Sequence, residues 1–343
     1  MILNNRIKIG VLTSSRADYG IYKNLLKLLF DHNNVDLSII VFGMHLQNQH
    51  GETIKEIISD NYFDNIFKVD GMPFGDSKLD ISKGYGELVQ SFSKFWNKNI
   101  FDLVFALGDR FEMSAAVQAG LPYELKLAHI HGGEISLGSI DNIYRDQISV
   151  ASQLHFTSTL DAAKRLKKLL IDKKFVYNVG SLSVDKLDIQ TLPKWEIICN
   201  NFNIPNKPFV LITFHPETVG TEKNESYIKV LYKSLSELSK SIHLIITQAN
   251  ADSSGKLYIE MNLSLKKENS NNISIVESFG KTNYFAAIKN SVFLLGNTSS
   301  GIIEAASFGK YVLNVGKRQH GRTRSKNIID VDFDKKEILK NSK

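Results

Sequence analysis

The sequence predicts an α/β protein built from two doubly wound domains that face one cleft. Short apolar strands alternate with longer amphipathic stretches almost from the first residue, and this alternation is typical of parallel sheets covered by helices. The chain has 343 residues, whereas a single hydrophobic core rarely grows past about 250 to 300 residues. The alternation also stops once and then restarts. We therefore expect two domains, at residues 1–180 and 181–343.

The first domain begins with a strand and continues as alternating elements. Helical spacing of apolar residues is present at Tyr22–Phe30, and a second helix is expected from Thr53–Ser59. The strands that we expect are Ile7–Thr13, Leu37–Phe42, Leu103–Leu107, Leu127–Ile130 and Leu154–Thr157.

The alternation stops after Asn178–Leu182, in a stretch of mixed polarity that holds Pro193, Pro205 and Pro208. We interpret this stretch as the junction between the domains. The strands expected after it are Phe209–Thr213, Ile242–Thr247, Ile273–Val276, Val292–Leu295 and Tyr311–Val315. The helices expected between them are Tyr227–Lys240, Thr282–Ile288 and Gly301–Phe308.

Composition and charge exclude several classes of protein. The longest apolar runs have the size of strands, whereas a bilayer span needs about 18 to 20 residues, so we expect no membrane segment. The net charge of +6 favours anionic ligands. The lysines gather at Lys164–Lys174 and Lys335–Lys343, where solvated helix faces explain them better than nucleic acid does. With the single Cys199 and no leader before Arg6, we expect a cytoplasmic protein.

In doubly wound sheets, ligands bind beyond the carboxyl ends of the strands, so the residues that follow each strand carry the chemistry. Thr13–Gly20 follows the first strand and opens a helix. Its backbone N–H groups and Arg16 are candidates to hold a phosphate. The segment has neither the dinucleotide-binding glycine pattern nor the P-loop pattern. The alternative is an ordinary capped helix start with a solvated arginine.

Asp109 and Arg110 follow the strand Leu103–Leu107, at the rim of the predicted cleft. A charged pair at this position suggests function. The alternative is structural, because charges at strand ends often cap helices or pair with neighbours.

His129, His131 and Glu134 form a dense group directly after another strand, with Asp141 and Arg145 near the next helix. Two histidines one residue apart suggest zinc, but no third ligand stands at a recognised spacing, so we expect no metal. Paired carboxylates beside a sugar ring would instead supply a general base and a general acid, if their surroundings separate their pKa values.

In the second half, His215 stands directly after a strand, and Gly296–Glu304 joins another strand to a helix. Hydroxyl residues and glycines at a helix start predict an anion site, and Glu304 is placed to accept hydrogen bonds from ribose hydroxyls. Arg318, after the last predicted strand, would add a cation. An ordinary N-cap explains Thr298 or Ser299 alone, but not the whole group.

Seven motifs in this order resemble the UDP-N-acetylglucosamine 2-epimerase family, and within it the hydrolysing branch that supplies sialic, legionaminic and related acids. The motifs are SSRADYG, LGDRFE, HIHGGE with Gly138–Arg145 after it, GSLSVDKL, TFHPET, GNTSSGIIEA and VGKRQHGR. The resemblance implies two Rossmann-like domains in the arrangement of glycosyltransferase-B enzymes. It also implies that the first domain carries the catalytic carboxylates and that UDP is held mainly by the second.

The resemblance assigns roles to motif residues. The implied catalytic candidates are Asp109, Glu134, Asp141 and Asp185. The residues implied to bind UDP are Arg16, Arg110, His215, Thr298, Ser299, Ser300, Glu304 and Arg318. Where some relatives carry a glutamate, this chain has His131, which is therefore a further candidate for the base because its ordinary pKa is near 6.5.

The implied reaction eliminates UDP from UDP-N-acetylglucosamine, or from its 2,4-diacetamido-2,4,6-trideoxy analogue UDP-N,N'-diacetylbacillosamine, to give a glycal. Water then adds and a free sugar of inverted configuration at carbon 2 is released. No cofactor is required, and a homodimer or higher oligomer is expected by resemblance. The alternatives are a non-hydrolysing epimerase, which returns a UDP-sugar, and a glycosyltransferase of the same fold.

Overall fold

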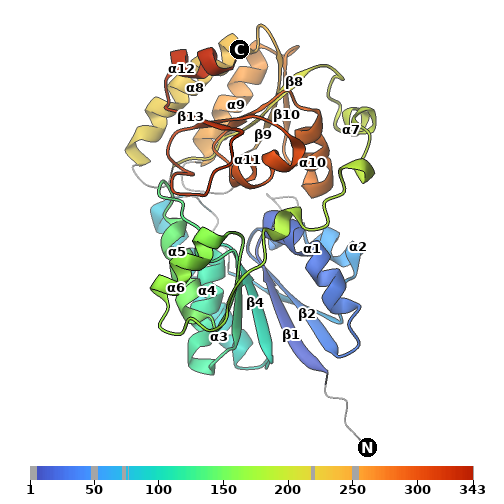
Figure 1. Ribbon diagram of the computed structural model, residues 1–343, viewed down its shortest axis with the longest axis vertical. Helices are drawn as coiled ribbons and strands as arrows, with labels where there is room; N and C mark the ends of the chain where they lie inside the picture. The colour runs from blue at the N-terminus through green and yellow to red at the C-terminus, as the bar shows by residue number, and fades with distance from the viewer. Residues whose placement is uncertain are drawn as a thin grey trace, which may run out of the picture. The chain divides into compact units, whose positions relative to one another are not determined.

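The computed structural model describes residues 6–47, 53–71, 75, 77–217, 221–248 and 255–342, and its contacts divide the chain into two units (Figure 1). Unit 1 contains the chain up to Glu134 together with Asp141–Lys186. Unit 2 contains Ile135–Ile140 and the chain from Leu187 onward. The sequence places the division after residue 180, and the contacts place it after Lys186.

Unit 1 is a parallel sheet of seven strands in the order β3-β2-β1-β4-β5-β6-β7. Its strands are β1 (Ile7–Thr13), β2 (Val35–Phe42), β3 (Asn65–Val69), β4 (Leu103–Leu107), β5 (Leu127–Ile130), β6 (Leu154–Thr157) and β7 (Val176–Asn178). Its helices are α1 (Arg16–Phe30), α2 (Ile54–Asp60), α3 (Lys78–Trp96), α4 (Phe111–Gly120), α5 (Asp141–Ala151) and α6 (Leu160–Leu169). Single 3₁₀ turns lie at η1 (Gly43–Leu46), η3 (Leu121–Tyr123) and η4 (Leu182–Val184).

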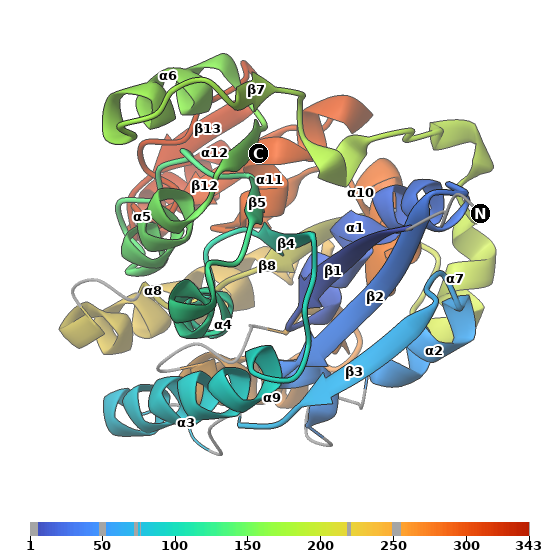
Figure 2. The same cartoon turned by 90° about the horizontal axis from the view of Figure 1, so that it is seen from below.

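Helices cover both faces of this sheet. Tyr22 of α1 and Ile57 of α2 pack with β1 and β2 on one face, whereas Phe92 of α3, Met113 of α4 and Ile148 of α5 pack on the other. Figure 1 shows α1 and α2 on one side of β1 and β2, and α3 and α4 on the other. Figure 2 shows β1, β2 and β3 side by side. The first half is therefore doubly wound, as predicted.

Unit 2 repeats this design with six parallel strands in the order β10-β9-β8-β11-β12-β13. Its strands are β8 (Phe209–Thr213), β9 (His243–Thr247), β10 (Ile273–Val276), β11 (Leu294–Gly296), β12 (Val312–Val315) and β13 (Ile328–Val331). Its helices are α7 (Trp195–Phe202), α8 (Asn224–Leu238), α9 (Gly255–Glu268), α10 (Gly280–Asn290), α11 (Ser299–Ile303) and α12 (Lys335–Asn341). Its 3₁₀ turns are η5 (Ile189–Thr191), η6 (Thr221–Lys223) and η7 (Ala305–Phe308).

The proline-bearing stretch that we interpreted as the junction folds as part of unit 2. It holds α7, whose Trp195 and Ile198 are buried in a core with α10. The Trp195 ring stacks on Phe209 of β8 with centroids 4.8 Å apart. The prolines therefore flank a packed helix instead of marking a linker.

Residues Ile135–Ile140, which we name the crossing segment, belong to unit 2 although both neighbours in the chain belong to unit 1. The Leu137 N–H donates to the His320 carbonyl at 3.0 Å. A side chain at Gly138 would come within 2.7 Å of the Lys317 carbonyl oxygen. The segment therefore needs glycine where it packs against the loop that follows β12.

Strand order changes direction at one position in each sheet, and the loops after the strands diverge there. In unit 1 this position lies between β1 and β4, and in unit 2 between β8 and β11. Ligands of doubly wound sheets bind at such positions. SSRADYG and LGDRFE follow β1 and β4, whereas TFHPET and GNTSSG follow β8 and β11. Among the described residues, no helix is long and apolar enough to cross a membrane.

Candidate active site

The loop after β1 is organised by the buried carboxylate of Asp18. It accepts hydrogen bonds from the Ser14 N–H at 2.8 Å, the Ser15 N–H at 3.0 Å and the Thr13 hydroxyl at 2.8 Å. Burial raises the pKa of Asp18, but the interactions with His45 and the donors from Ser14 and Thr13 outweigh it, so the pKa lies below its ordinary value. The expectation that these backbone N–H groups are available for phosphate is wrong at Ser14 and Ser15, because Asp18 already occupies them.

Arg145 of α5 joins the two loops that carry Asp109 and Glu134. Its residue is 1% exposed, and its guanidinium forms an ion pair with the Asp109 carboxylate. Another nitrogen of the same group donates to the Glu134 carbonyl at 2.9 Å. Arg145 therefore links the Asp109 carboxylate to the backbone of the loop that carries Glu134, within unit 1.

Glu134 is 9% exposed as a residue, and its carboxylate accepts a hydrogen bond from the Ser158 hydroxyl at 2.5 Å. Arg110 forms an ion pair with Glu112, whereas Asp109 forms one with Arg145. The Arg110 guanidinium lies 2.9 Å from the buried Glu112 carboxylate. Each charge of the LGDRFE motif therefore has an opposite charge in unit 1, and Arg110 is oriented by Glu112.

His131 has a left-handed backbone with φ of 62° and is buried. Its Nε2 accepts a hydrogen bond from the Leu182 N–H at 3.1 Å. Since a backbone N–H can only donate, this Nε2 carries no proton and its lone pair is engaged. The contact favours a positioning role for His131 over a role as base through Nε2.

Asp141 and Asp185 differ in their surroundings. Asp141 is the first residue of α5 and is half-buried. Asp185 is exposed, and its backbone carbonyl accepts from Asn24 at 2.7 Å. Within the described parts of the chain, no hydrogen bond or ion pair joins the Asp185 carboxylate to Asp109, Arg145 or Glu134.

In unit 2, two buried asparagines hold the segment after β8. Asn297 accepts from the His215 N–H and donates to the His215 carbonyl, both at 2.8 Å. Asn224 does the same at Glu217, with distances of 3.2 and 2.9 Å. Each amide therefore binds one backbone residue as a neighbouring strand would. Thr218, the last residue of the TFHPET motif, lies outside the described residues.

The GNTSSG turn contains the ordinary N-cap that was the structural alternative at Thr298. Thr298 is the N-cap of α11, and its hydroxyl accepts from the Gly301 N–H at 3.1 Å. Ser299 is the first residue of that helix. Ser300 donates to the Glu304 carboxylate at 2.7 Å and lies 3.2 Å from the Tyr284 hydroxyl. Burial and the nearby Glu304 carboxylate raise the pKa of Tyr284, so the phenol stays protonated.

The loop after β12 is tied to both of these motifs. The Lys317 N–H donates to the Glu217 carboxylate at 2.7 Å, and the buried Gln319 amide donates to the Asn297 carbonyl at 2.9 Å. Half-buried Arg318 lies between these two anchors in the chain. The three unit 2 motifs therefore form one hydrogen-bonded group.

Sequence reasoning gave no individual role to Arg145, Asn297, Asn224 or Gln319. Arg145 is a lone cation on the buried face of an amphipathic helix, and such a residue almost always has a partner. Its partner lies 36 residues away in the chain, so no local pattern shows it. The asparagines and Gln319 bind backbone groups, which no sequence pattern reports.

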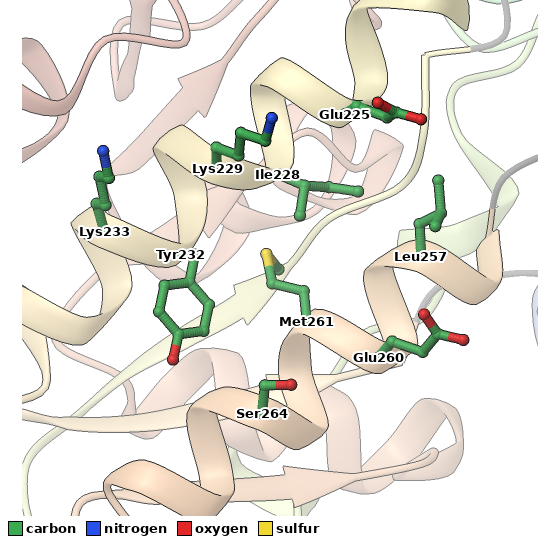
Figure 3. A pocket seen from close by; sticks show the side chains of 9 residues that line it. All are labelled: Glu225, Ile228, Lys229, Tyr232, Lys233, Leu257, Glu260, Met261 and Ser264. Atoms are coloured by element: carbon green, nitrogen blue, oxygen red, sulfur yellow. The ribbon is translucent and has the colours of Figure 1, made fainter.

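A surface pocket of about 470 Å³ lies elsewhere in unit 2, between α8 and α9 (Figure 3). Tyr232, Lys229 and Met261 are among its lining residues. It contains none of the predicted site residues. In the described part of the chain, no three His, Cys, Asp or Glu side chains are placed to hold a metal ion.

A family model described as UDP-N-acetylglucosamine 2-epimerase matches residues 27–343. The chain belongs to this family. It is 34% identical over 334 residues to the polysialic acid biosynthesis protein P7 of Escherichia coli, covering 97% of this chain and 84% of that protein. It is 33% identical over 335 residues to the GDP/UDP-N,N'-diacetylbacillosamine 2-epimerase (hydrolyzing) of Campylobacter jejuni, covering 95% and 84%.

The fold of this epimerase family member also matches a solved structure. The UDP-GlcNAc 2-epimerase of Methanocaldococcus jannaschii, in complex with UDP-GlcNAc and UDP, superimposes with a TM-score of 0.78. The match covers 98% of this chain and 92% of that one at 16% identity. The family predicted from the seven motifs and the α/β fold predicted from the alternation of strands and helices are thus confirmed, and the chain is an enzyme of the epimerase type.

Proposed function

We propose that this epimerase hydrolyses a UDP-linked 2-acetamido sugar and releases the free 2-epimer. The substrate is UDP-N-acetylglucosamine or UDP-N,N'-diacetylbacillosamine, and the product is N-acetylmannosamine or 2,4-diacetamido-2,4,6-trideoxymannose. One observation supports the proposal: in each unit the family motifs follow the carboxyl ends of the strands, and two of them stand where strand order reverses. Arg145 links the Asp109 carboxylate to the loop of Glu134 in unit 1, and hydroxyl and amide groups join the motifs of unit 2. The name of the Campylobacter relative supports the hydrolysing branch.

The chemistry explains why carboxylates and cations are both required. The hydrogen at carbon 2 is not next to a carbonyl, so the bond from carbon 1 to the diphosphate must break early while a carboxylate removes the proton. UDP leaves and a double bond forms between carbons 1 and 2. One water then adds at carbon 1, and carbon 2 receives a proton on the opposite face. Groups that stabilise the departing diphosphate therefore contribute to catalysis as well as to binding.

In this proposal the sugar-side residues all lie in unit 1, whereas the nucleotide-binding candidates come from both units. Asp109 and Glu134 exchange protons with the sugar, with Asp141 and Asp185 as further carboxylate candidates. His131 orients the loop through Leu182. Glu304 accepts hydrogen bonds from the ribose. The remaining nucleotide-binding candidates are Arg16, Arg110, His215, Thr298, Ser299, Ser300 and Arg318.

The direct test is to incubate the protein with each UDP-sugar and follow the reaction by proton NMR. We expect stoichiometric UDP and a free monosaccharide of inverted configuration at carbon 2, with deuterium at carbon 2 when the solvent is D₂O. A UDP-sugar product would instead identify a non-hydrolysing epimerase. Sugar transfer to an added acceptor would identify a glycosyltransferase. By family resemblance, we also propose a cytoplasmic homodimer.

A further inference from the structure

His129 is a buried histidine whose two ring nitrogens are both engaged. It lies on β5 and is 0% exposed. Its Nε2 is 2.8 Å from the Gly108 carbonyl oxygen, and its Nδ1 is 2.9 Å from the Ser149 hydroxyl. Because a carbonyl only accepts, Nε2 must carry the proton, and a neutral ring then accepts from Ser149 at Nδ1. The contacts therefore select one tautomer.

The group that the ring holds is the peptide immediately before Asp109. Gly108 has φ of 79°, a conformation that favours glycine. Its N–H donates to the Ile130 carbonyl at 3.0 Å, and its carbonyl accepts from His129. Both polar groups of Gly108 are thus attached to β5 and its side chain. The position of the Asp109 backbone follows from the orientation of this peptide.

The same ring also packs against the loop that carries Glu134. A Cβ added at Gly132 would lie 2.8 Å from His129 Nδ1 and 2.9 Å from the Ser149 hydroxyl oxygen. The backbone of Gly132 therefore passes directly over the bond between the ring and Ser149. His129 contacts the LGDRFE turn on one side and the HIHGGE loop on the other.

We propose that His129 is a positioning residue for the epimerase reaction, which holds the Gly108–Asp109 peptide by donating from Nε2 and supports the loop of Glu134 with its ring. It touches no substrate atom. The inference rests on the proposed function, because it presumes that Asp109 and Glu134 act on the sugar. Burial lowers the pKa of His129 to about 3, although the bond to Gly108 opposes this shift, so the ring stays neutral at working pH.

Two variants separate the positioning role from a packing role. The amide nitrogen of glutamine can take the place of Nε2, whereas asparagine reaches only the place of Nδ1. We expect His129→Asn to lower kcat on the order of 100-fold, as a displacement of about 1 Å can, while KM stays within a factor of about two. We expect His129→Gln to recover most of this loss.

His243→Gln is the matched control. His243 is also buried, its Nε2 lies 3.0 Å from the Ser274 hydroxyl oxygen, and it starts β9 in unit 2. We expect this variant to keep the wild-type kcat even if it lowers the melting temperature equally. A wild-type kcat in His129→Asn, or equal losses in the two His129 variants, would overturn the proposal.

A readout without substrate keeps this inference distinct from the proposed function. Long-range ¹H–¹⁵N NMR of the histidine rings should find His129 protonated at Nε2 alone from pH 8 to pH 5. The Gly108 and Asp109 amide signals should move in His129→Asn and stay near their wild-type positions in His129→Gln. A wild-type protein inactive on both UDP-sugars would refute the proposed function alone, whereas an Nδ1–H tautomer would refute the role of His129.

Discussion

The motif loops of unit 1 are held together mainly by charged side chains, whereas those of unit 2 are held mainly by neutral amides. In unit 1, Asp18 organises the loop after β1, and Arg145 joins Asp109 to the loop of Glu134. In unit 2, Asn297 and Asn224 bind backbone groups, with the Glu217 carboxylate as a charged contributor. Fixed charges orient the groups that we propose to move protons, and neutral amides shape the part that we propose to bind UDP.

The comparison predicts that removing a unit 1 carboxylate stops turnover without weakening UDP binding. We expect Asp109→Asn or Glu134→Gln to lower kcat by about 10²- to 10⁴-fold, the usual contribution of general acid or base groups. Calorimetry should find nearly unchanged UDP affinity. Asp172→Asn, an exposed aspartate of unit 1, serves as the control. Wild-type turnover in both variants would contradict the assignment of Asp109 and Glu134 to proton transfer.

The buried charge of unit 1 makes a second, smaller prediction. Arg145→Met removes a buried guanidinium and leaves the Glu134 carbonyl and the 25% exposed Asp109 carboxylate without this donor. We therefore expect the free energy of unfolding to fall by about 1 to 3 kcal/mol, together with loss of activity. The matched control is Arg165→Met, because Arg165 pairs with Asp146 but is itself about a quarter exposed, whereas the Arg145 side chain is buried. That surface pair should contribute about 1 kcal/mol or less. Equal losses in urea unfolding would contradict the distinction.

In unit 2, removing a carboxylate should weaken UDP binding, whereas in unit 1 it should lower turnover. We expect Glu304→Ala to weaken UDP binding by about 1.5 to 3 kcal/mol, the usual value for hydrogen bonds to a charged group. The Ser300 hydroxyl loses the Glu304 carboxylate but keeps the Tyr284 hydroxyl as a partner, so we expect the fold to stay intact. The control is Glu237→Ala on α8, which removes an exposed glutamate paired with Lys240; this variant should bind UDP as the wild type does. Unchanged calorimetric affinity in Glu304→Ala would reduce Glu304 to a residue of the helix surface.

Asp18 gives the smallest predicted effect, and it depends on pH. The folded-state pKa of Asp18 lies below its ordinary 3.8. Its contribution to stability is therefore complete above about pH 3.8 and is lost as the pH falls through the folded-state value, by at most about 1.4 kcal/mol per pH unit. Asp18→Asn should flatten the acid limb of urea midpoints measured from about pH 5 down to about pH 2. The control is Asp31→Asn at an exposed position, which should keep the wild-type slope of urea midpoint against pH. An unchanged slope in Asp18→Asn would show that Asp18 does not cause the acid loss of stability.

Apolar runs located much of the fold, because strands buried on both faces are continuously apolar. The predicted bounds of β1, β4, β5, β6, β8 and β10 agree with the structure. The edge strands β3, β7 and β13 and the helices α3, α4, α7 and α9 were not predicted. Half of β13 is exposed and β3 buries only Val69, so their sequences lack the signal. Prolines around α7 obscured a helix that is defined by the packing of Trp195.

The candidate site was predictable as a set of loops, but the partners within it were not. Position after a strand places Asp109, Glu134 and His215 at the carboxyl edges of the sheets. It cannot show that Arg145 reaches Asp109, because periodicity reports the face of a helix and not the group opposite. It also cannot show that Asp18 occupies amides that a phosphate would need. The proposed roles of these residues remain predictions.

The crossing segment has a consequence for how this enzyme can be divided. Because Ile135–Ile140 is counted with unit 2, the polypeptide changes unit three times, and no single cut yields both halves whole. A fragment starting at Leu187 would lack the crossing segment, whose Leu137 N–H donates to the His320 carbonyl. A chimera that takes unit 2 whole from a relative must therefore exchange two separate stretches of gene, one for the crossing segment and one for the chain from Leu187 onward.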